Sequence, residues 1–206
     1  MNNVNYLERT VNGSNQISLK TKLLEKRIIY LDSEINRESV NETIQQIALL
    51  SAEDPKGTIT MLISSPGGSI LEGLVLIDVM RSYGGIIKTV SLGIAASMAA
   101  VILAAGTKGH RYASKHSQVM LHQPLISGSI PGGNCSEIEE VAKSLLASKK
   151  QLDELLVELS GKEKKEIMKL TAKDTYLSAD KAKNHGLIDV IADGIELNEL
   201  IGGNAI

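Results

Sequence analysis

The sequence predicts an α/β protein in which strands and helices alternate along a single domain. Short apolar runs of strand length, such as ITMLI at 59–63, contain no polar residue, as expected for strands that are covered on both faces. Segments with apolar residues at helical spacing follow these runs, and glycine or proline clusters separate the two kinds of segment. We find no repeat of fixed period and no linker that would divide the 206 residues.

The composition is typical of a globular protein, with 43% hydrophobic and 22% charged residues. Phe and Trp are absent, so the core must be built from Ile, Leu, Val, Ala and Met. The net charge of −2 argues against a nucleic acid as partner. The longest apolar stretch, 93–106, is shorter than the roughly 20 residues that span a bilayer, and the N-terminus lacks the pattern of a secretory signal. We therefore expect no membrane association and a cytoplasmic location.

The first half of the chain supplies three strands, each preceded or followed by a helix. Residues 1–17 are polar and aperiodic, and we expect them to be mobile or to be ordered only by a partner. Apolar residues at helical spacing from residue 39 predict a helix that ends at the turn DPKG. The turn SSPGGS separates the second strand from the next helix, which a pair of glycines ends. The strands are expected at 27–31, 59–63 and 86–92, and the second helix at 71–81.

The second half contains a long helix at 136–160. Its start reads as a capping box, with Ser136 as N-cap and Glu139 at the third helical position. Apolar residues recur every seven positions along it, so one face packs on something, within the subunit or between subunits. These residues are Ile138, Leu145, Leu152 and Leu159. The remaining elements are strands at 109–114, 118–122 and 187–191, helices at 98–105, 163–170 and 178–185, and a C-terminal tail at 194–206.

Ser97 is the first candidate for a reactive side chain. It lies where the strand at 86–92 and the residues after it give way to an Ala-rich helix, in the string GIAASMAAVILAAG. A serine at such a junction can project its hydroxyl from a tight turn beside the unpaired N–H groups of the helix N-terminus. The alternative is that Ser97 only caps the helix, because serine is favoured at the N-cap. This stretch alone leaves both interpretations open.

Three further features bear on Ser97. Gly67 and Gly68 lie between a buried strand and a helix, where backbone N–H groups can face a developing oxyanion. His122 ends a strand beside a loop, where a general base would lie, and it is the best placed of the four histidines. Asp174 lies in an irregular segment and is either an acid partner or a solvated loop carboxylate.

Four strings in series closely resemble the proteolytic subunits of the Clp protease, the ClpP family. They are SPGGSILEG, GIAASMAAVILAAG, SQVMLHQPL and KDTYLSADKAKNHGLID. The resemblance covers about residues 17–193. It implies a superhelix of ββα units, the fold that this family shares with the crotonases, with a protease domain at 18–193 from which the helix at 136–160 protrudes as a handle.

The resemblance implies a serine endopeptidase. It assigns the nucleophile to Ser97, the general base to His122, and the carboxylate that orients the base to Asp174. The backbone N–H groups of Gly68 and Met98 would form the oxyanion hole. The loop after Pro124 would pair with an extended substrate as an added strand. The residues expected to bind substrate are Gly67, Leu125, Ile126 and Ser127.

The resemblance also implies an assembly. Seven-membered rings of this subunit would stack face to face through the handle helices and enclose the active sites. An ATP-driven unfoldase of the AAA+ class would dock on the rings and feed in polypeptide substrates, as part of protein quality control. The chain contains no P-loop motif, so we expect it to bind no nucleotide, and we expect no metal or other cofactor.

Two alternatives remain. In the first, the chain is a weakly active or structural subunit of a mixed particle with a second subunit of the same family. Ala172 and Lys173 stand where the family usually has an acidic residue and an arginine that pair across the ring interface. In the second, the chain is a crotonase-fold enzyme that acts on acyl-CoA thioesters through a backbone oxyanion hole, which leaves Ser97, His122 and Asp174 without a joint role.

Overall fold

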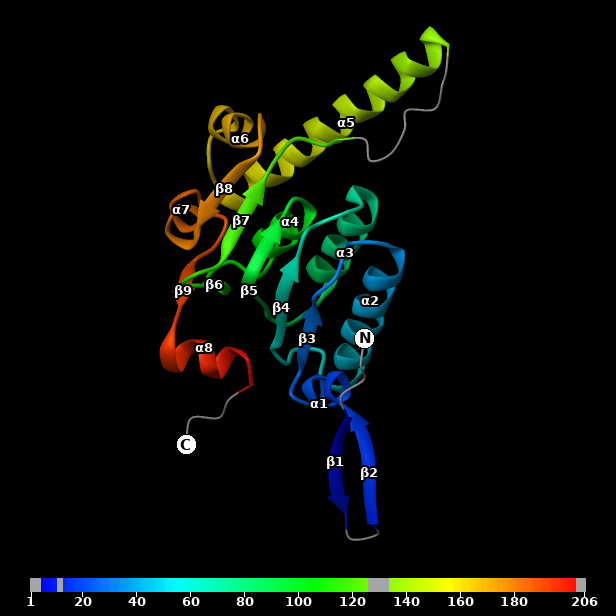
Figure 1. Cartoon of the computed structure of the whole chain (residues 1–206), viewed down its shortest axis with the longest axis vertical. Coiled ribbons are helices and arrows are strands. Elements are labelled where there is room, and N and C mark those ends of the chain that lie inside the picture. Colours follow the sequence, from blue (N-terminus) through cyan, green and yellow to red (C-terminus); the bar gives the residue numbers. More distant parts are fainter. Residues whose placement is uncertain (1–4, 11–12, 126–133, 203–206) are drawn as a thin grey trace.

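The computed structural model describes residues 5–10, 13–125 and 134–202 and confirms the α/β class (Figure 1). The strands are β1 (Asn5–Thr10), β2 (Gly13–Ser18), β3 (Ile28–Leu31), β4 (Ile59–Ser65), β5 (Ile87–Ala96), β6 (Arg111–Ser114), β7 (Gln118–Leu121), β8 (Thr175–Ser178) and β9 (Val190–Ala192). The helices are α1 (Leu19–Glu25), α2 (Arg37–Glu53), α3 (Ile70–Ser82), α4 (Met98–Ala104), α5 (Cys135–Ser160), α6 (Lys164–Thr171), α7 (Ala179–Asn184) and α8 (Gly194–Leu200).

The strand β5 lies at the centre of the main sheet and changes partner along its length. On one side it pairs in parallel with β4, which pairs in turn with β3. On the other side, residues 89–91 pair with β6 and residues 94–96 pair with β7. The sheet continues from β6 to β9 and, separately, from β7 to the antiparallel β8. The sheet therefore divides into two branches at β5. Ser97 directly follows Ala96, the last residue of β5 that pairs with β7.

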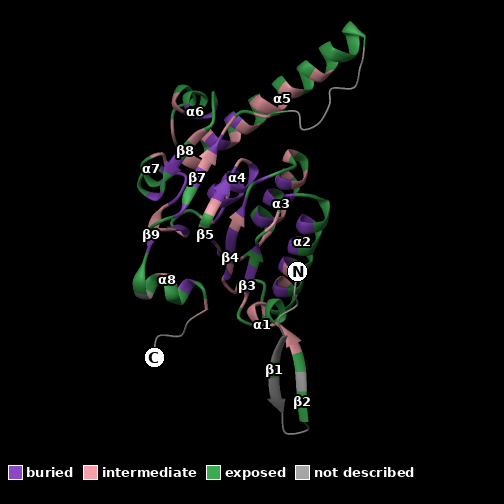
Figure 2. Cartoon of the chain, viewed as in Figure 1, coloured by how far each residue is buried: buried purple, intermediate pink, exposed green. Residues whose placement is uncertain are grey.

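The core is aliphatic, as the composition requires. Ile59, Met61 and Ile63 of β4 are fully buried, which explains why this strand reads as an unbroken apolar run. The helix α4 is buried at each of its positions (Figure 2). Burial of these side chains supplies the main stabilisation of the fold. Because α4 follows Ser97 directly, the segment that carries this serine is fixed by the core.

Both chain ends differ from expectation. Residues 5–10 and 13–18 form the antiparallel hairpin β1–β2, although this segment was expected to lack regular structure. Its pairing comes from backbone hydrogen bonds, and its polar sequence carries no apolar alternation that would reveal a strand. The helix α1 was not predicted, and the expected C-terminal tail contains α8. Both are helices of seven residues, too short for a clear apolar period.

The long helix α5 begins one residue earlier than predicted, and its cap is a different residue. The side chain of Asn134 accepts hydrogen bonds from the N–H groups of Ser136 and Glu137, and Glu137 accepts one from the N–H of Asn134. The prediction of Ser136 as N-cap with Glu139 is therefore wrong. The sequence contains two overlapping capping boxes, two residues apart, and only the first is formed.

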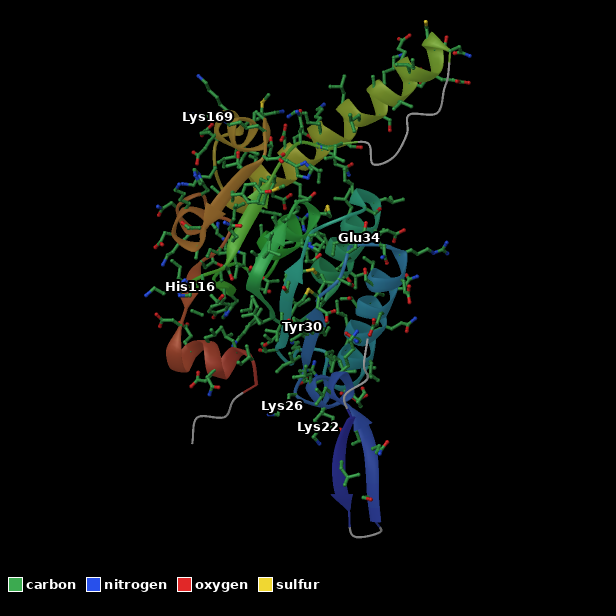
Figure 3. All side chains as sticks on the ribbon, in the orientation of Figure 1. Lys22, Lys26, Tyr30, Glu34, His116 and Lys169 are labelled. Atoms are coloured by element: carbon green, nitrogen blue, oxygen red, sulfur yellow. The ribbon has the colours of Figure 1, made fainter. Side chains whose placement is uncertain are left out.

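The outer part of α5 extends away from the sheet and from the other helices, at the opposite end of the molecule from the β1–β2 hairpin (Figures 1 and 3). Ile138 is 51% exposed and Leu146 is 66% exposed, whereas Leu156 at the inner end is buried. Leu152 and Leu159 of the predicted apolar stripe pack against the core. The stripe is thus covered within the chain only at its inner end. Among the helices of the described ranges, none combines the length and apolar character needed to cross a membrane.

Candidate active site

Ser97 joins β5 to α4 in a strained conformation. Its φ is 54° and its ψ is −124°, and Arg27 is the other non-glycine residue of the described ranges with positive φ. Such a conformation costs about 1–3 kcal/mol and persists only where the surroundings hold it. The N–H of Ser97 donates to the carbonyl of Met120 in β7 at 2.8 Å. Its hydroxyl makes no capping hydrogen bond, so the interpretation of Ser97 as a mere cap is wrong.

The hydroxyl of Ser97 instead faces His122. Oγ of Ser97 lies 2.8 Å from Nε2 of His122, within hydrogen-bond distance. His122 directly follows β7, and β7 pairs with the last residues of β5, so two adjacent parallel strands bring the two side chains to the same edge of the sheet. The sequence prediction that these two residues act together therefore has the geometry that a nucleophile and its base require.

Gly67 and Gly68 form the turn between β4 and α3, and Gly67 packs against the Ser97 segment. Gly67 has a φ of 93°, and a Cβ there would lie 2.5 Å from the carbonyl oxygen of Ala96 and 2.7 Å from Cβ of Ser97. Gly68 faces Ile35 in a bridge in which Gly67 and Ser69 make both hydrogen bonds, so the bridge leaves the N–H of Gly68 free.

Met98 offers a second backbone donor. It is the first residue of α4, a position whose N–H has no acceptor inside a helix. Gly68 and Met98 both line the cavity that contains Ser97.

The backbones of Asp174 and His122 lie side by side, but among the described residues their side chains share no hydrogen bond. The antiparallel register of β7 and β8 places Leu121 opposite Thr175, so the next pair in that register is His122 and Asp174. Asp174 is exposed, and within the described residues no hydrogen bond joins its carboxylate to His122. The segment before it is attached to the site through Gln123, whose amide donates to the carbonyl of Ala172 at 3.4 Å.

A cavity of about 520 Å³ opens at Ser97 and His122. Gly68 of the glycine turn and residues of α4 and α5 line it. Of the residues expected to bind substrate, Gly67 contacts the Ser97 segment and Leu125 lines the cavity with an exposed side chain. Ile126 and Ser127 lie outside the described residues.

A polar cluster at this cavity is not among the site residues predicted from the sequence. Asp153, on the inner part of α5, is only 4% exposed and lines the cavity together with Thr171 at the end of α6. Oδ2 of Asp153 accepts from Nζ of Lys149 at 2.5 Å, and Oδ1 accepts from the hydroxyl of Thr171 at 3.0 Å. The signal in the sequence was a carboxylate placed between Leu152 and Leu156, on the apolar face of the helix.

A buried ion pair holds the ends of the helices that flank the cavity. Arg111 of β6 is buried and forms a bidentate pair with Asp189. Its guanidinium also donates to the carbonyls of Ala104 and Leu159, at the ends of α4 and α5. Burial raises the pKa of the Asp189 carboxyl, but its hydrogen bonds and attraction to Arg111, with the N–H of Gly109, outweigh burial and bring the pKa below its ordinary value.

The chain is similar to a known protein family. A family model described as Clp protease matches residues 11–194. The match covers nearly the whole chain and includes Ser97, His122, Asp174 and the glycine turn. It confirms the resemblance that the four strings indicated.

Proposed function

The chain belongs to the Clp protease family, a family of peptidases, and we propose that it is a serine endopeptidase that cleaves unfolded polypeptides into peptides. In this proposal Ser97 is the nucleophile and His122 is its general base. Asp174 orients His122, and the N–H groups of Gly68 and Met98 form the oxyanion hole. Gly67, Leu125, Ile126 and Ser127 bind the extended substrate.

The contact between Ser97 and His122 carries this proposal. With Oγ and Nε2 2.8 Å apart, His122 can take the hydroxyl proton as Oγ attacks a peptide carbonyl, and can return it to the leaving amine. The tetrahedral intermediate develops negative charge on the former carbonyl oxygen, which free backbone N–H groups stabilise. In a second step, water gives its proton to His122 and attacks the ester carbonyl, and the acyl group is released from Ser97, which takes the proton back.

The test is the variant Ser97→Ala, with Ser82→Ala as its control. Ser82 ends α3, its hydroxyl donates to the carbonyl of Val79, and it is not among the described residues that line the cavity. We expect Ser97→Ala to lose at least about 10³-fold in hydrolysis of a fluorogenic peptide, and to lose labelling by a fluorophosphonate. Ser82→Ala should retain both. Undiminished hydrolysis by Ser97→Ala would exclude this mechanism.

The proposal extends to assembly. The exposed outer part of α5, with Ile138 and Leu146 uncovered, supports a handle through which seven-membered rings stack. Stacked rings would enclose the sites, and an AAA+ unfoldase would supply unfolded chains, as in cytoplasmic protein quality control. Particle mass measured with and without Leu146→Glu tests the stacking.

One observation favours a second candidate, a weakly active subunit of a mixed particle. Asp174 is exposed and makes no hydrogen bond to His122 within the described residues. Peptide hydrolysis by the isolated subunit, compared with a mixture that includes a second subunit of the family, distinguishes the two candidates. The crotonase alternative gains no support from the site, because acyl-CoA chemistry on a backbone oxyanion hole gives the Ser97–His122 contact no role.

A further inference from the structure

A buried carboxylate, that of Asp153, lines the cavity at Ser97 among apolar side chains. Besides Ser97 and His122, Val101 of α4 and Leu152 and Leu156 of α5 line the cavity. Asp153 lies on the same face of α5 and lines the cavity while being 4% exposed. A buried carboxylate of this kind must be stabilised by partners, and the identity of those partners determines what it can still bind.

Among the described residues, the partners of Asp153 leave part of its acceptor capacity unused. An ionised carboxylate can accept about four hydrogen bonds. Asp153 accepts one from Lys149 and one from Thr171, one on each oxygen. The charge of Lys149 also balances that of Asp153, so the pair adds polarity to the cavity without adding net charge.

We infer that Asp153 determines specificity by selecting a substrate residue with a neutral hydrogen-bond donor at the end of its side chain, glutamine above all, on the acyl side of the cleaved bond. The inference rests on the proposed peptidase function. Because His122 returns the proton to the leaving amine, the amine side departs towards His122, whereas the acyl-side residue stays attached to Ser97 at this cavity. An amide N–H₂ at the end of its side chain would donate to the free acceptor positions of Asp153.

The open acceptor positions of Asp153 and its charge pair with Lys149 disfavour other substrate side chains. An aliphatic side chain of equal length would displace water from Asp153 and return no hydrogen bond. A cationic side chain would lose its hydration and meet a carboxylate that Lys149 already neutralises. An anionic one would be repelled by Asp153. We expect glutamine to exceed methionine, which has the same length and no donor, by about tenfold in kcat/KM.

The experiment compares three fluorogenic peptides that differ only in Gln, Met or Lys at the acyl-side position. They are tested on the intact protein and on three variants, Asp153→Leu, Lys149→Met and Lys150→Met. Lys150 is exposed next to Lys149 and serves as the matched control. The ratio of kcat/KM for two peptides is measured within each variant, so it does not depend on the fraction of active protein. Labelling rates of peptide phosphonates with the same side chains give that ratio without turnover.

Asp153→Leu should abolish the preference for Gln over Met. Lys149→Met should leave an unbalanced carboxylate and shift the preference towards Lys, whereas Lys150→Met should leave the three ratios unchanged. Equal or faster cleavage of the Met peptide by the intact protein, or an unchanged ratio in Asp153→Leu, would overturn this inference alone. Failure of the intact protein to cleave or be labelled by any of the peptides would overturn the proposed function as well.

Discussion

The two sides of His122 differ in how they are held. On one side, Ser97 is fixed by β5, β7 and the buried helix α4, and its hydroxyl contacts Nε2 of the histidine. On the other side, Asp174 lies on an exposed segment between α6 and β8 and makes no hydrogen bond to the histidine within the described residues. A single chain thus brings the proposed nucleophile and base into contact, and leaves the proposed acid beside them without a hydrogen bond among the described residues.

The difference follows from where each residue lies in the packing. Ser97 directly precedes a helix that is buried along its whole length, so moving it would disrupt the core. Ala172 and Lys173, which precede Asp174, are exposed, and among the described residues only the weak hydrogen bond from Gln123 attaches them to the site. Local stability is lowest where few buried contacts are made. We therefore expect that a neighbouring subunit orders the Asp174 side in the working particle.

The largest effect is expected from Asp174→Asn. If Asp174 turns onto His122 in the assembled particle, this change should lower kcat/KM of peptide hydrolysis by about 10⁴-fold, because the histidine loses the carboxylate that sets its tautomer. Asp180→Asn, in the exposed first turn of α7, is the control and should have no effect. A loss of less than tenfold would mean that Ser97 and His122 act without the acid.

The next effect concerns stability. Asp189→Asn leaves the buried guanidinium of Arg111 without its charged partner, which should lower the free energy of unfolding by about 3–5 kcal/mol. Arg81→Met breaks the exposed pair with Glu158 and should cost at most about 1 kcal/mol. Denaturant unfolding at pH 7 measures both, and equal effects would contradict the central role given to the buried pair.

The same pair predicts a pH dependence. Because its pKa is lowered in the folded state, Asp189 contributes stability above its unfolded pKa, and this contribution is lost as the pH falls through the folded value. The difference in unfolding free energy between the intact protein and Asp189→Asn should therefore be constant at neutral pH and shrink below about pH 4. A difference that grows on acidification would show the opposite sign of coupling.

Gly67→Ala should disturb the Ser97 side directly. The added Cβ would lie within 3 Å of atoms of Ala96 and Ser97, and displacing the proposed nucleophile by about 1 Å should cost about 10²-fold in rate. Gly109→Ala provides the control, because Gly109 also has a positive φ, of 87°, but its Cβ would meet nothing within 4 Å. Both variants carry backbone strain, so both should lose some stability. Peptidase activity should fall only in Gly67→Ala. That result would show that the activity depends on the position of Ser97.

Sequence reasoning predicted the parts of this molecule that local patterns encode. The run ITMLI, the glycine turn and the Ala-rich segment after Ser97 placed β4, α3 and α4 to within a few residues. The β1–β2 hairpin escaped because backbone pairing of polar residues leaves no apolar period. Asp153 escaped because its role depends on Thr171, from another helix, which only the tertiary fold brings to it. The contact between Ser97 and His122 was anticipated through family resemblance and not through spacing.

The smallest effect is expected at the start of α5, where the sequence contains two overlapping capping boxes. Asn134→Ala removes the acceptor for the N–H groups of Ser136 and Glu137, and loss of such a cap costs about 1 kcal/mol. The outer part of α5 has few packing contacts, so it depends on local capping and should fray. Faster amide hydrogen exchange over residues 136–140, with exchange in α4 unchanged, measures this effect.

Ser136→Ala is the matched control, because it removes the hydroxyl that the sequence pattern favoured as the cap. The side chain of Asn134 occupies that role, so Ser136→Ala should leave exchange at the start of α5 within a few tenths of a kcal/mol of the intact protein. Faster exchange in Ser136→Ala than in Asn134→Ala would mean that the second box forms in solution. If rings stack through α5, assembly should suppress the fraying of Asn134→Ala while leaving the subunit alone frayed, because contacts from a partner would replace the missing cap. The exposed half of α5 would then resemble the Asp174 segment, in that both become ordered through a neighbouring subunit.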